Sequence, residues 1–126
     1  MRVKIYYHHT DAGGVVYYAT YLHFLEEART EFLAERRISV RGLVESGTLF
    51  VVVRQEIDYK APAFYGDILE VGTRISRSTG VRIEFEHLVK NQQQQLVVKA
   101  KTTLACVDKN LKPKAIPGEI QKNITT

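Results

Sequence analysis

Cysteine, proline and long apolar runs are scarce in this sequence, and tryptophan is absent. The 126 residues include one cysteine, one methionine and three prolines. The single thiol, Cys106, excludes an internal disulfide and fits a reducing compartment. No run of about 18 apolar residues is present, as a membrane-spanning helix requires, and the first ten residues lack the apolar segment of a signal peptide. We therefore expect a cytoplasmic protein with no membrane partner.

The composition is that of an ordinary folded domain. Hydrophobic residues make up 44% and charged residues 25% of the chain, which predicts one globular domain over residues 1–126. The net charge of +4 suits an anionic partner. Charge alone leaves nucleic acid, acidic lipid and a phosphate-bearing cofactor open, and dispersed basic residues are also typical of a solvated surface.

One long helix is the clearest periodic feature. Between residues 16 and 37, Tyr21, Leu25, Ala28 and Phe32 recur at helical spacing among charged residues, which predicts an amphipathic helix over this range. A shorter helix should follow, with Ser39 as its N-cap and Gly47 as its stop.

The remaining segments have the alternation of β-strands. They lie at residues 2–7, 49–60, 67–77, 81–91 and 96–108. The short connections between the last four favour sequential antiparallel neighbours. One long helix covering one face of one antiparallel sheet is an α+β architecture.

The segment "HHTDAGGVVYYATYLHF", residues 8–24, places the carboxylate of Asp11 between a threonine and two glycines, ahead of the long helix. Aspartate before glycine commonly forms an Asx-turn, in which the side chain bonds its own backbone. The alternative is catalytic: unpaired N–H groups at the helix start would polarise a carbonyl while the carboxylate attacks it or activates water. The local pattern leaves both interpretations open.

Three longer segments carry a family resemblance. They are "YYHHTDAGGVVYYATYLHFLEEARTEFL", "DYKAPAFYGDILEV" and "ACVDKNLKPKAIP". Together they resemble the hotdog-fold acyl-CoA thioesterases of the 4-hydroxybenzoyl-CoA thioesterase family, including the bacterial branch associated with the Tol–Pal region, over about residues 3 to 118. The resemblance implies a hotdog fold, in which an antiparallel sheet wraps around one long central helix. It also implies hydrolysis of acyl-CoA, a homo-oligomer of at least two and more commonly four copies, no cofactor and no nucleic-acid partner.

The resemblance also assigns site residues. The catalytic carboxylate of the family falls on Asp11, as nucleophile or general base, and the backbone N–H of Tyr18, at the expected helix start, would polarise the thioester carbonyl. His9 replaces the first acidic residue of the family's motif, and Tyr18 stands where the Tol–Pal branch usually has histidine. The substrate-binding prediction comprises Gly14, Val15, Tyr21, Lys60, Arg77 and Arg82, the last three as partners of the coenzyme A phosphates.

Other residues of the right chemical type are assigned structural roles. Metal binding is not expected, because His8, His9, Asp11, His23 and His87 lack ligand spacing. Cys106 lies in an apolar strand and should be a packing residue. Glu56, Asp58 and Glu70 are expected on an exposed strand face. Two alternatives for the whole chain are a dehydratase on the same fold and a non-enzymatic module that binds acyl chains or nucleic acid.

Overall fold

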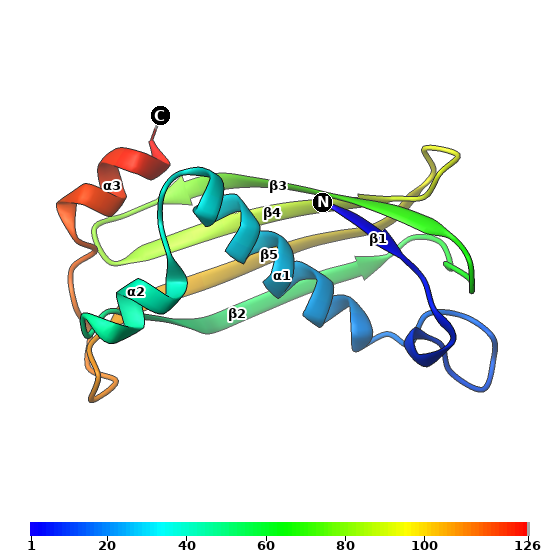
Figure 1. Cartoon of the computed structure of the whole chain (residues 1–126), viewed down its shortest axis with the longest axis horizontal. Coiled ribbons are helices and arrows are strands. Elements are labelled where there is room, and N and C mark those ends of the chain that lie inside the picture. The colour runs from blue at the N-terminus through cyan, green and yellow to red at the C-terminus, as the bar shows by residue number, and fades with distance from the viewer. Residues whose placement is uncertain (126) are drawn as a thin grey trace.

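A computed structural model describes residues 1–125, and Thr126, the last residue of the predicted domain, lies outside the described residues. Figure 1 shows the arrangement of its elements. In chain order they are β1 (Arg2–Lys4), the 3₁₀ helix η1 (Tyr7–His9), α1 (Thr20–Glu35), α2 (Val40–Glu45), β2 (Leu49–Tyr59), β3 (Ile68–Ser78), β4 (Arg82–Lys90), β5 (Leu96–Val107) and α3 (Gly118–Ile124).

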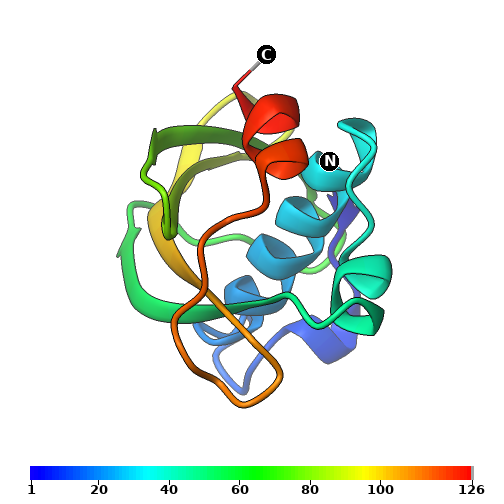
Figure 2. The same ribbon diagram turned by 90° about the vertical axis from the view of Figure 1, so that its left-hand side faces the viewer.

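The five strands form one antiparallel sheet in the order β1-β3-β4-β5-β2. The sheet curls, and α1 lies along its concave side (Figures 1 and 2). The expected α+β architecture, with one long helix on one face of an antiparallel sheet, is therefore confirmed.

The expectation that sequential strands are neighbours fails at one place. β3, β4 and β5 follow one another across the sheet, but β2 pairs with β5, and β1 lies beside β3. The chain between β2 and β3, residues 60–67, crosses the end of the sheet. Three strand spacings of ~4.8 Å are within reach of such a segment at ~3.3 Å per residue. The segment is therefore long enough to connect two strands that are not neighbours, and its turn residues alone do not show that it does so.

The long helix is shorter than predicted. It begins at Thr20 rather than at residue 16, because Val16 lies in a β-bridge with Thr10. It ends in a Schellman arrangement, in which the Ile38 N–H donates to the Leu33 carbonyl at 2.9 Å and Arg37 takes a left-handed φ of 62°. The predicted caps of α2 are present: the Ser39 hydroxyl accepts the Gly42 N–H, and Gly47 follows with φ 86°. The sequence did not predict η1 or α3.

The core consists of two apolar clusters placed one after the other along α1. The first cluster lies toward the start of α1 and includes Phe24, Leu25 and Ala28. The second lies toward its end and includes Leu33 together with Ile120 and Ile124 of α3. The sheet supplies the rest of both clusters, so that the curled strands and α1 bury each other's apolar faces.

A row of polar side chains crosses the core between these two clusters. We call it the polar belt, and its members are Arg29, Gln55, Thr73, His87 and Thr102. They come from α1, β2, β3, β4 and β5, respectively, and strand register places them side by side, since Gln55 pairs with Thr102 and Thr73 with His87. His87 and Thr102 are fully buried, and Arg29 is 9% exposed.

His87 is held neutral within the belt. Its Nδ1 lies 3.1 Å from the Thr73 hydroxyl, whereas Nε2 has no partner among residues 1–125. Burial, reinforced by the positive charge of Arg29, lowers the pKa of His87 from 6.5 to about 4. Protonation of this side chain therefore favours the unfolded state.

We predict that part of the pH dependence of the unfolding free energy comes from His87 and is lost in His87→Asn. Because the folded pKa lies below the unfolded one, the contribution of His87 is complete above pH 6.5 and declines as the pH falls toward 4. Between pH 7 and pH 5 the wild type should lose roughly 2 kcal/mol more unfolding free energy than the variant, at 1.36 kcal/mol per pH unit. Urea unfolding at both pH values measures this. Equal losses in the two proteins would contradict the assignment.

Candidate functional site

The loop that carries Asp11 is pinned to the end of the sheet. The Val16 N–H donates to the Ala63 carbonyl at 2.8 Å, and Val15 forms a β-bridge with Phe64. Val16 and Ala63 are buried in the first core cluster. The loop therefore has a fixed position relative to α1 and to the crossing segment 60–67.

Asp11 itself stands at the exposed tip of this loop. Its Oδ1 accepts the Gly13 N–H at 2.8 Å, and its carbonyl accepts the Gly14 N–H at 3.0 Å. Gly14 has φ 82°, a left-handed conformation that favours glycine. The Asx-turn, one of the two interpretations that the sequence leaves open, is therefore present, yet it uses one carboxylate oxygen only. Within residues 1–125, Oδ2 has no hydrogen-bond or ion-pair partner.

A second aspartate nearby makes a useful contrast. Asp67 closes the turn before β3: Oδ2 accepts the Phe64 N–H at 2.9 Å, and Oδ1 accepts the side-chain amide of Gln92 at 3.0 Å. Both of its oxygens are engaged in holding the crossing segment to the β4–β5 hairpin. Asp67 is thus a structural carboxylate, whereas Asp11 keeps one oxygen available to a ligand.

Tyr18 lies in the turn before α1 rather than at the helix start, which corrects the predicted position. The Thr20 N–H donates to the Tyr17 carbonyl at 2.9 Å, so that Tyr18 and Ala19 are the two central residues of a turn. The Tyr18 N–H has no acceptor within residues 1–125, and its carbonyl accepts the Tyr59 hydroxyl at 2.9 Å. Tyr59 ends β2, so this bond fixes the turn to the sheet.

Tyr17 connects the Asp11 loop with this turn. Its N–H donates to the His9 carbonyl at 2.9 Å, and its ring centroid lies 4.7 Å from that of Tyr18. The pKa of Tyr17 is raised, mainly by hydrogen bonding with the Tyr18 side chain. The negative charge of Asp11 makes a smaller contribution in the same direction. The Tyr17 phenol is therefore neutral at pH 7 and lies within the field of Asp11.

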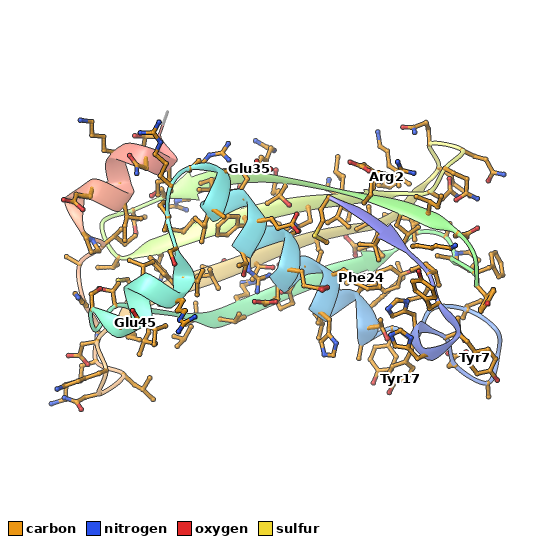
Figure 3. All side chains as sticks on the ribbon, viewed as in Figure 1. Arg2, Tyr7, Tyr17, Phe24, Glu35 and Glu45 are labelled. Carbon is orange, nitrogen blue, oxygen red and sulfur yellow. The ribbon has the colours of Figure 1, made fainter. Side chains whose placement is uncertain are left out.

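Exposed aromatic side chains surround this end of the molecule. They are Tyr6, Tyr7, Tyr17, Tyr18, Tyr59, Phe64 and Tyr65, which we call the aromatic rim. Figure 3 shows Tyr7 and Tyr17 at the end of the molecule opposite Glu45. Large apolar groups gathered on one exposed surface are typical of a site that binds a ligand or another chain.

The predicted substrate-binding residues fall into two separate groups. Gly14, Val15 and Lys60 lie at the Asp11 end, and Tyr21 is buried beneath the loop, where burial raises its pKa to about 12. Arg77 and Arg82 lie at the opposite end of the sheet, roughly 30 Å away along β3 at ~3.3 Å per residue.

Arg77 and Arg82 do lie together. They line one pocket of about 240 Å³ with Thr79, Glu84 and Thr103. The pocket opens on the face of the sheet that turns away from α1, because Thr103 alternates with the buried Thr102 along β5. The structure thus forms a two-arginine site but separates it from the carboxylate of the same chain.

Comparisons with known proteins identify the family. A model of the thioesterase-like superfamily matches residues 6–124. The chain belongs to the thioesterase-like superfamily. It is 40% identical over 119 residues to the acyl-CoA thioester hydrolase YbgC of Escherichia coli O6:H1, covering 94% of this chain and 89% of that one. It is 44% identical over 122 residues to the acyl-CoA thioesterase YbgC of Haemophilus influenzae, covering 94% and 88%.

A solved structure agrees with these relatives. Slr0204, a 1,4-dihydroxy-2-naphthoyl-CoA thioesterase from Synechocystis, superposes with a TM-score of 0.92 at 26% identity, over 99% of this chain and 93% of that one. The predicted hotdog fold, the family resemblance and the classification as a thioester-hydrolysing enzyme are thereby confirmed.

His9 has a structural role that sequence reasoning missed in this thioesterase. Its Nδ1 accepts the Tyr6 N–H at 2.9 Å and so closes η1, and its ring packs edge-on against Phe24 with centroids 5.2 Å apart. Burial, with a smaller effect from His8, lowers the pKa of His9, and the bond from the Tyr6 N–H requires Nδ1 to be unprotonated. An aspartate at this position would offer the same kind of acceptor, which explains how histidine can replace the acidic residue of the motif.

The other candidate groups do not assemble into a second site. Glu56 and Glu70 are exposed and pair with Arg54 and the N-terminal ammonium, and Asp58 is exposed as expected. Cys106 is buried in the second core cluster. Over the described residues, no three histidine, cysteine or acidic side chains are grouped as metal ligands, and no helix has the length and apolar character to cross a bilayer.

Proposed function

We propose that this thioesterase hydrolyses acyl-CoA thioesters to a free acid and coenzyme A, with Asp11 as nucleophile or general base and the Tyr18 N–H as the donor to the thioester carbonyl. One observation supports the proposal best. Asp11 Oδ2 and the Tyr18 N–H lie on one anchored segment, and neither has a hydrogen-bond partner within residues 1–125. A carbonyl placed between them would meet an attacking oxygen and a polarising donor together.

The chemistry needs only these groups and water. In one route, Asp11 takes a proton from water as the water oxygen attacks the carbonyl carbon. In the other, an Asp11 oxygen attacks and forms an anhydride, which water then cleaves. In both routes the carbon–sulfur bond breaks, the thiolate of coenzyme A leaves and is protonated, and the Tyr18 N–H stabilises the charge on the carbonyl oxygen. The supporting geometry is the same for both routes.

The aromatic rim favours a small acyl or aromatic acyl group. Tyr17, Tyr18 and Tyr59 present ring faces and edges beside the Asp11 loop, and Tyr18 and Tyr59 meet edge-on with centroids 6.5 Å apart. Such rings bind an apolar or aromatic body through burial and quadrupole contacts. The E. coli and H. influenzae relatives are named for acyl-CoA substrates, which supports the same substrate class here.

The position of the two arginines supports an oligomeric site. Arg77 and Arg82 suit phosphate, but in one chain they lie roughly 30 Å from Asp11 along the sheet. We propose that the coenzyme A phosphates bind to the arginine pair of another copy in a homo-oligomer, a dimer at least and a tetramer by family resemblance.

Cytoplasmic location stays a prediction.

We predict that Asp11→Asn removes catalysis without unfolding the protein. The amide can still accept the Gly13 N–H, so the turn is kept, while the nucleophile or base is lost. The kcat for a small acyl-CoA should fall by roughly 10²-fold or more, measured by release of the coenzyme A thiol. Asp58→Asn, which neutralises an exposed carboxylate on β2, is the matched control and should keep normal turnover. More than about a tenth of wild-type kcat in Asp11→Asn would remove Asp11 from the reaction.

We predict that the backbone of Tyr18, rather than its phenol, matters for rate. Tyr18→Phe keeps the N–H and should keep near-normal kcat. Tyr18→Pro removes the N–H, and proline is favoured at the first central position of the turn that Tyr18 occupies, so the fold should survive while kcat falls roughly 10²-fold. Circular dichroism checks the fold. Loss of turnover in Tyr18→Phe, or wild-type rates in folded Tyr18→Pro, would refute the backbone assignment.

We predict that Arg77→Ala and Arg82→Ala raise KM with little change in kcat, because phosphate contacts are shared by the ground and transition states. Mixed oligomers test whether the site is shared. Copies with Asp11→Asn still carry both arginines, so refolding them with Arg77→Ala/Arg82→Ala copies should restore low-KM activity above that of either parent. No gain on mixing, despite demonstrated hetero-oligomers, would contradict a shared site.

A further inference from the structure

The tight turn that follows β5 contains an unusual residue. Residues 108–112 reverse the chain, and a bridge between Val107 and Pro113 closes the turn. Within it, the Leu111 N–H donates to the Asp108 carbonyl at 2.9 Å, and the Asp108 N–H donates to the Lys112 carbonyl at 2.9 Å. Leu111 has φ 62° and is 67% exposed. The turn therefore presents a leucine to solvent in a left-handed backbone conformation.

Leucine is unfavourable here on local grounds. A three-residue turn of this kind ends on a left-handed residue, and glycine is preferred there because a Cβ atom crowds the backbone. Packing does not compensate Leu111, since two thirds of the side chain stays in water. A strained residue that the fold does not require points to a function. Among the positive-φ residues of the described chain Leu111 is the apolar one, and the others are Gly14, Gly47, Gly66, Arg37 and Gln94.

The rest of the turn is basic. Lys109 and Lys112 are exposed and form no ion pair within the described residues. Asp108 is the one acidic residue of the turn, and its Oδ1 is used internally: it accepts the N–H groups of Asn110 at 2.8 Å and Lys112 at 3.1 Å. The turn thus combines one exposed apolar side chain with two unpaired cations.

The turn is also firmly attached to the body of the protein. The Lys114 N–H donates to the Cys106 carbonyl at 3.0 Å, and the Lys114 ammonium donates to the Thr48 hydroxyl and the Gly47 carbonyl. In Figure 1 the turn, drawn in orange after β5, projects from the end of the molecule that carries α2. A rigid projection loses little conformational entropy when it binds.

We propose that residues 108–112 bind the surface of an anionic lipid bilayer, with the Leu111 side chain inserted below the headgroups and Lys109 and Lys112 among the lipid phosphates. A bilayer needs no complementary pocket, so one projecting apolar side chain can enter it, whereas a protein partner requires a much larger surface. The two ammonium groups and the net charge of +4 complement lipid phosphate. Such a contact is weak and reversible.

Surface binding differs from membrane spanning. The lack of a long apolar run led to the expectation of no membrane partner, and that lack does not bear on a turn that enters only the headgroup region. The bilayer contact therefore replaces that expectation as a proposal of its own.

This inference does not rest on the proposed function. The turn lies beside the start of β2, where Leu49 pairs with Val107, whereas the Asp11 loop lies at the Tyr59 end of β2. The two ends are roughly 30 Å apart at ~3.3 Å per residue. Hydrolysis of a soluble acyl-CoA should therefore be equal in the wild type and in variants of the turn. Vesicle binding can fail while Asp11→Asn still abolishes catalysis, and the reverse also holds.

Sedimentation with lipid vesicles tests the binding. The wild type should bind phosphatidylcholine vesicles that contain about a third phosphatidylglycerol, bind pure phosphatidylcholine much less, and dissociate at high salt. Leu111→Gly should remain folded, because glycine favours φ 62°, and should bind about tenfold more weakly or worse, because the leucine transfer is lost. Leu22→Ala, which shortens an exposed leucine of α1, is the control and should bind like the wild type.

The charge contribution has its own matched pair of variants. Lys109→Ala/Lys112→Ala should weaken binding to the anionic vesicles roughly tenfold or more, since each lysine near the surface contributes. Lys4→Ala/Lys99→Ala removes the same charge from exposed positions on β1 and β5 and should keep most of the binding.

The absence of tryptophan from the chain allows a direct test of insertion. Leu111→Trp places a single indole in the turn, and its emission should shift to the blue with anionic vesicles and be quenched by lipids brominated on their acyl chains. Leu22→Trp should show neither effect, because α1 does not meet the bilayer in this arrangement.

Each outcome supports or overturns the proposal. No preference of the wild type for anionic vesicles, or undiminished binding by folded Leu111→Gly, overturns it. Binding without a blue shift in Leu111→Trp also overturns it, because another face would then meet the lipid. A changed oligomer mass of Leu111→Gly in light scattering, with no vesicle binding by the wild type, would assign the leucine to a contact between copies instead. The wild-type comparison needs no variant.

Discussion

The hydrogen bond from the Val16 N–H to the Ala63 carbonyl is the constraint on which the proposed site depends. It ties the loop before α1 to the segment that crosses from β2 to β3, and both partners are buried in the first core cluster. Because of this anchor, Asp11 can stand at an exposed tip and still have a defined position. The Tyr59 hydroxyl fixes the following turn in the same way, through the Tyr18 carbonyl. Catalytic groups on loops need such rigid support, because small displacements cost much of the rate.

A second constraint acts deeper in the molecule. The polar belt divides the core at the middle of α1, and its side chains satisfy each other only in part. Hydrophobic residues at these positions would cost less to bury. Within residues 1–125, His87 Nε2 has no hydrogen-bond partner, and Arg29 makes one long hydrogen bond, to the Thr102 hydroxyl at 3.4 Å. The belt thus links α1 to β5 through the Arg29 side chain and the Thr102 hydroxyl.

Much of this organisation was predictable from the sequence, for identifiable reasons. Helical period marked α1, Ser39 and Gly47 marked α2, and alternation marked the strands, because these signals are local. The start of α1 was predicted too early, because the bridge between Thr10 and Val16 is a contact that helical period does not record. The place of β2 at the sheet edge beside β5 depends in the same way on long-range pairing.

In the candidate site, too, features that depend on local sequence were predictable and features that depend on long-range contacts were not. The Asx-turn of Asp11 is one of the two structures that the Asp-Ala-Gly-Gly pattern allows, and Arg77 and Arg82, both predicted as partners of the coenzyme A phosphates, line one pocket. The separation of that pair from Asp11 depends on strand length and the crossing segment, which local patterns do not encode. The capping role of His9 was likewise out of reach, since it depends on which neighbours the folded chain supplies.

The most direct test of the central claim is a crystal structure of the Asp11→Asn protein with an intact acyl-CoA bound. The account predicts the thioester carbonyl oxygen about 3 Å from the Tyr18 nitrogen. It also predicts the side-chain amide introduced at position 11 within about 3.5 Å of the carbonyl carbon, in position for attack or for a bridging water. A thioester bound with its carbonyl directed away from Tyr18, or held at another part of the molecule, would contradict it.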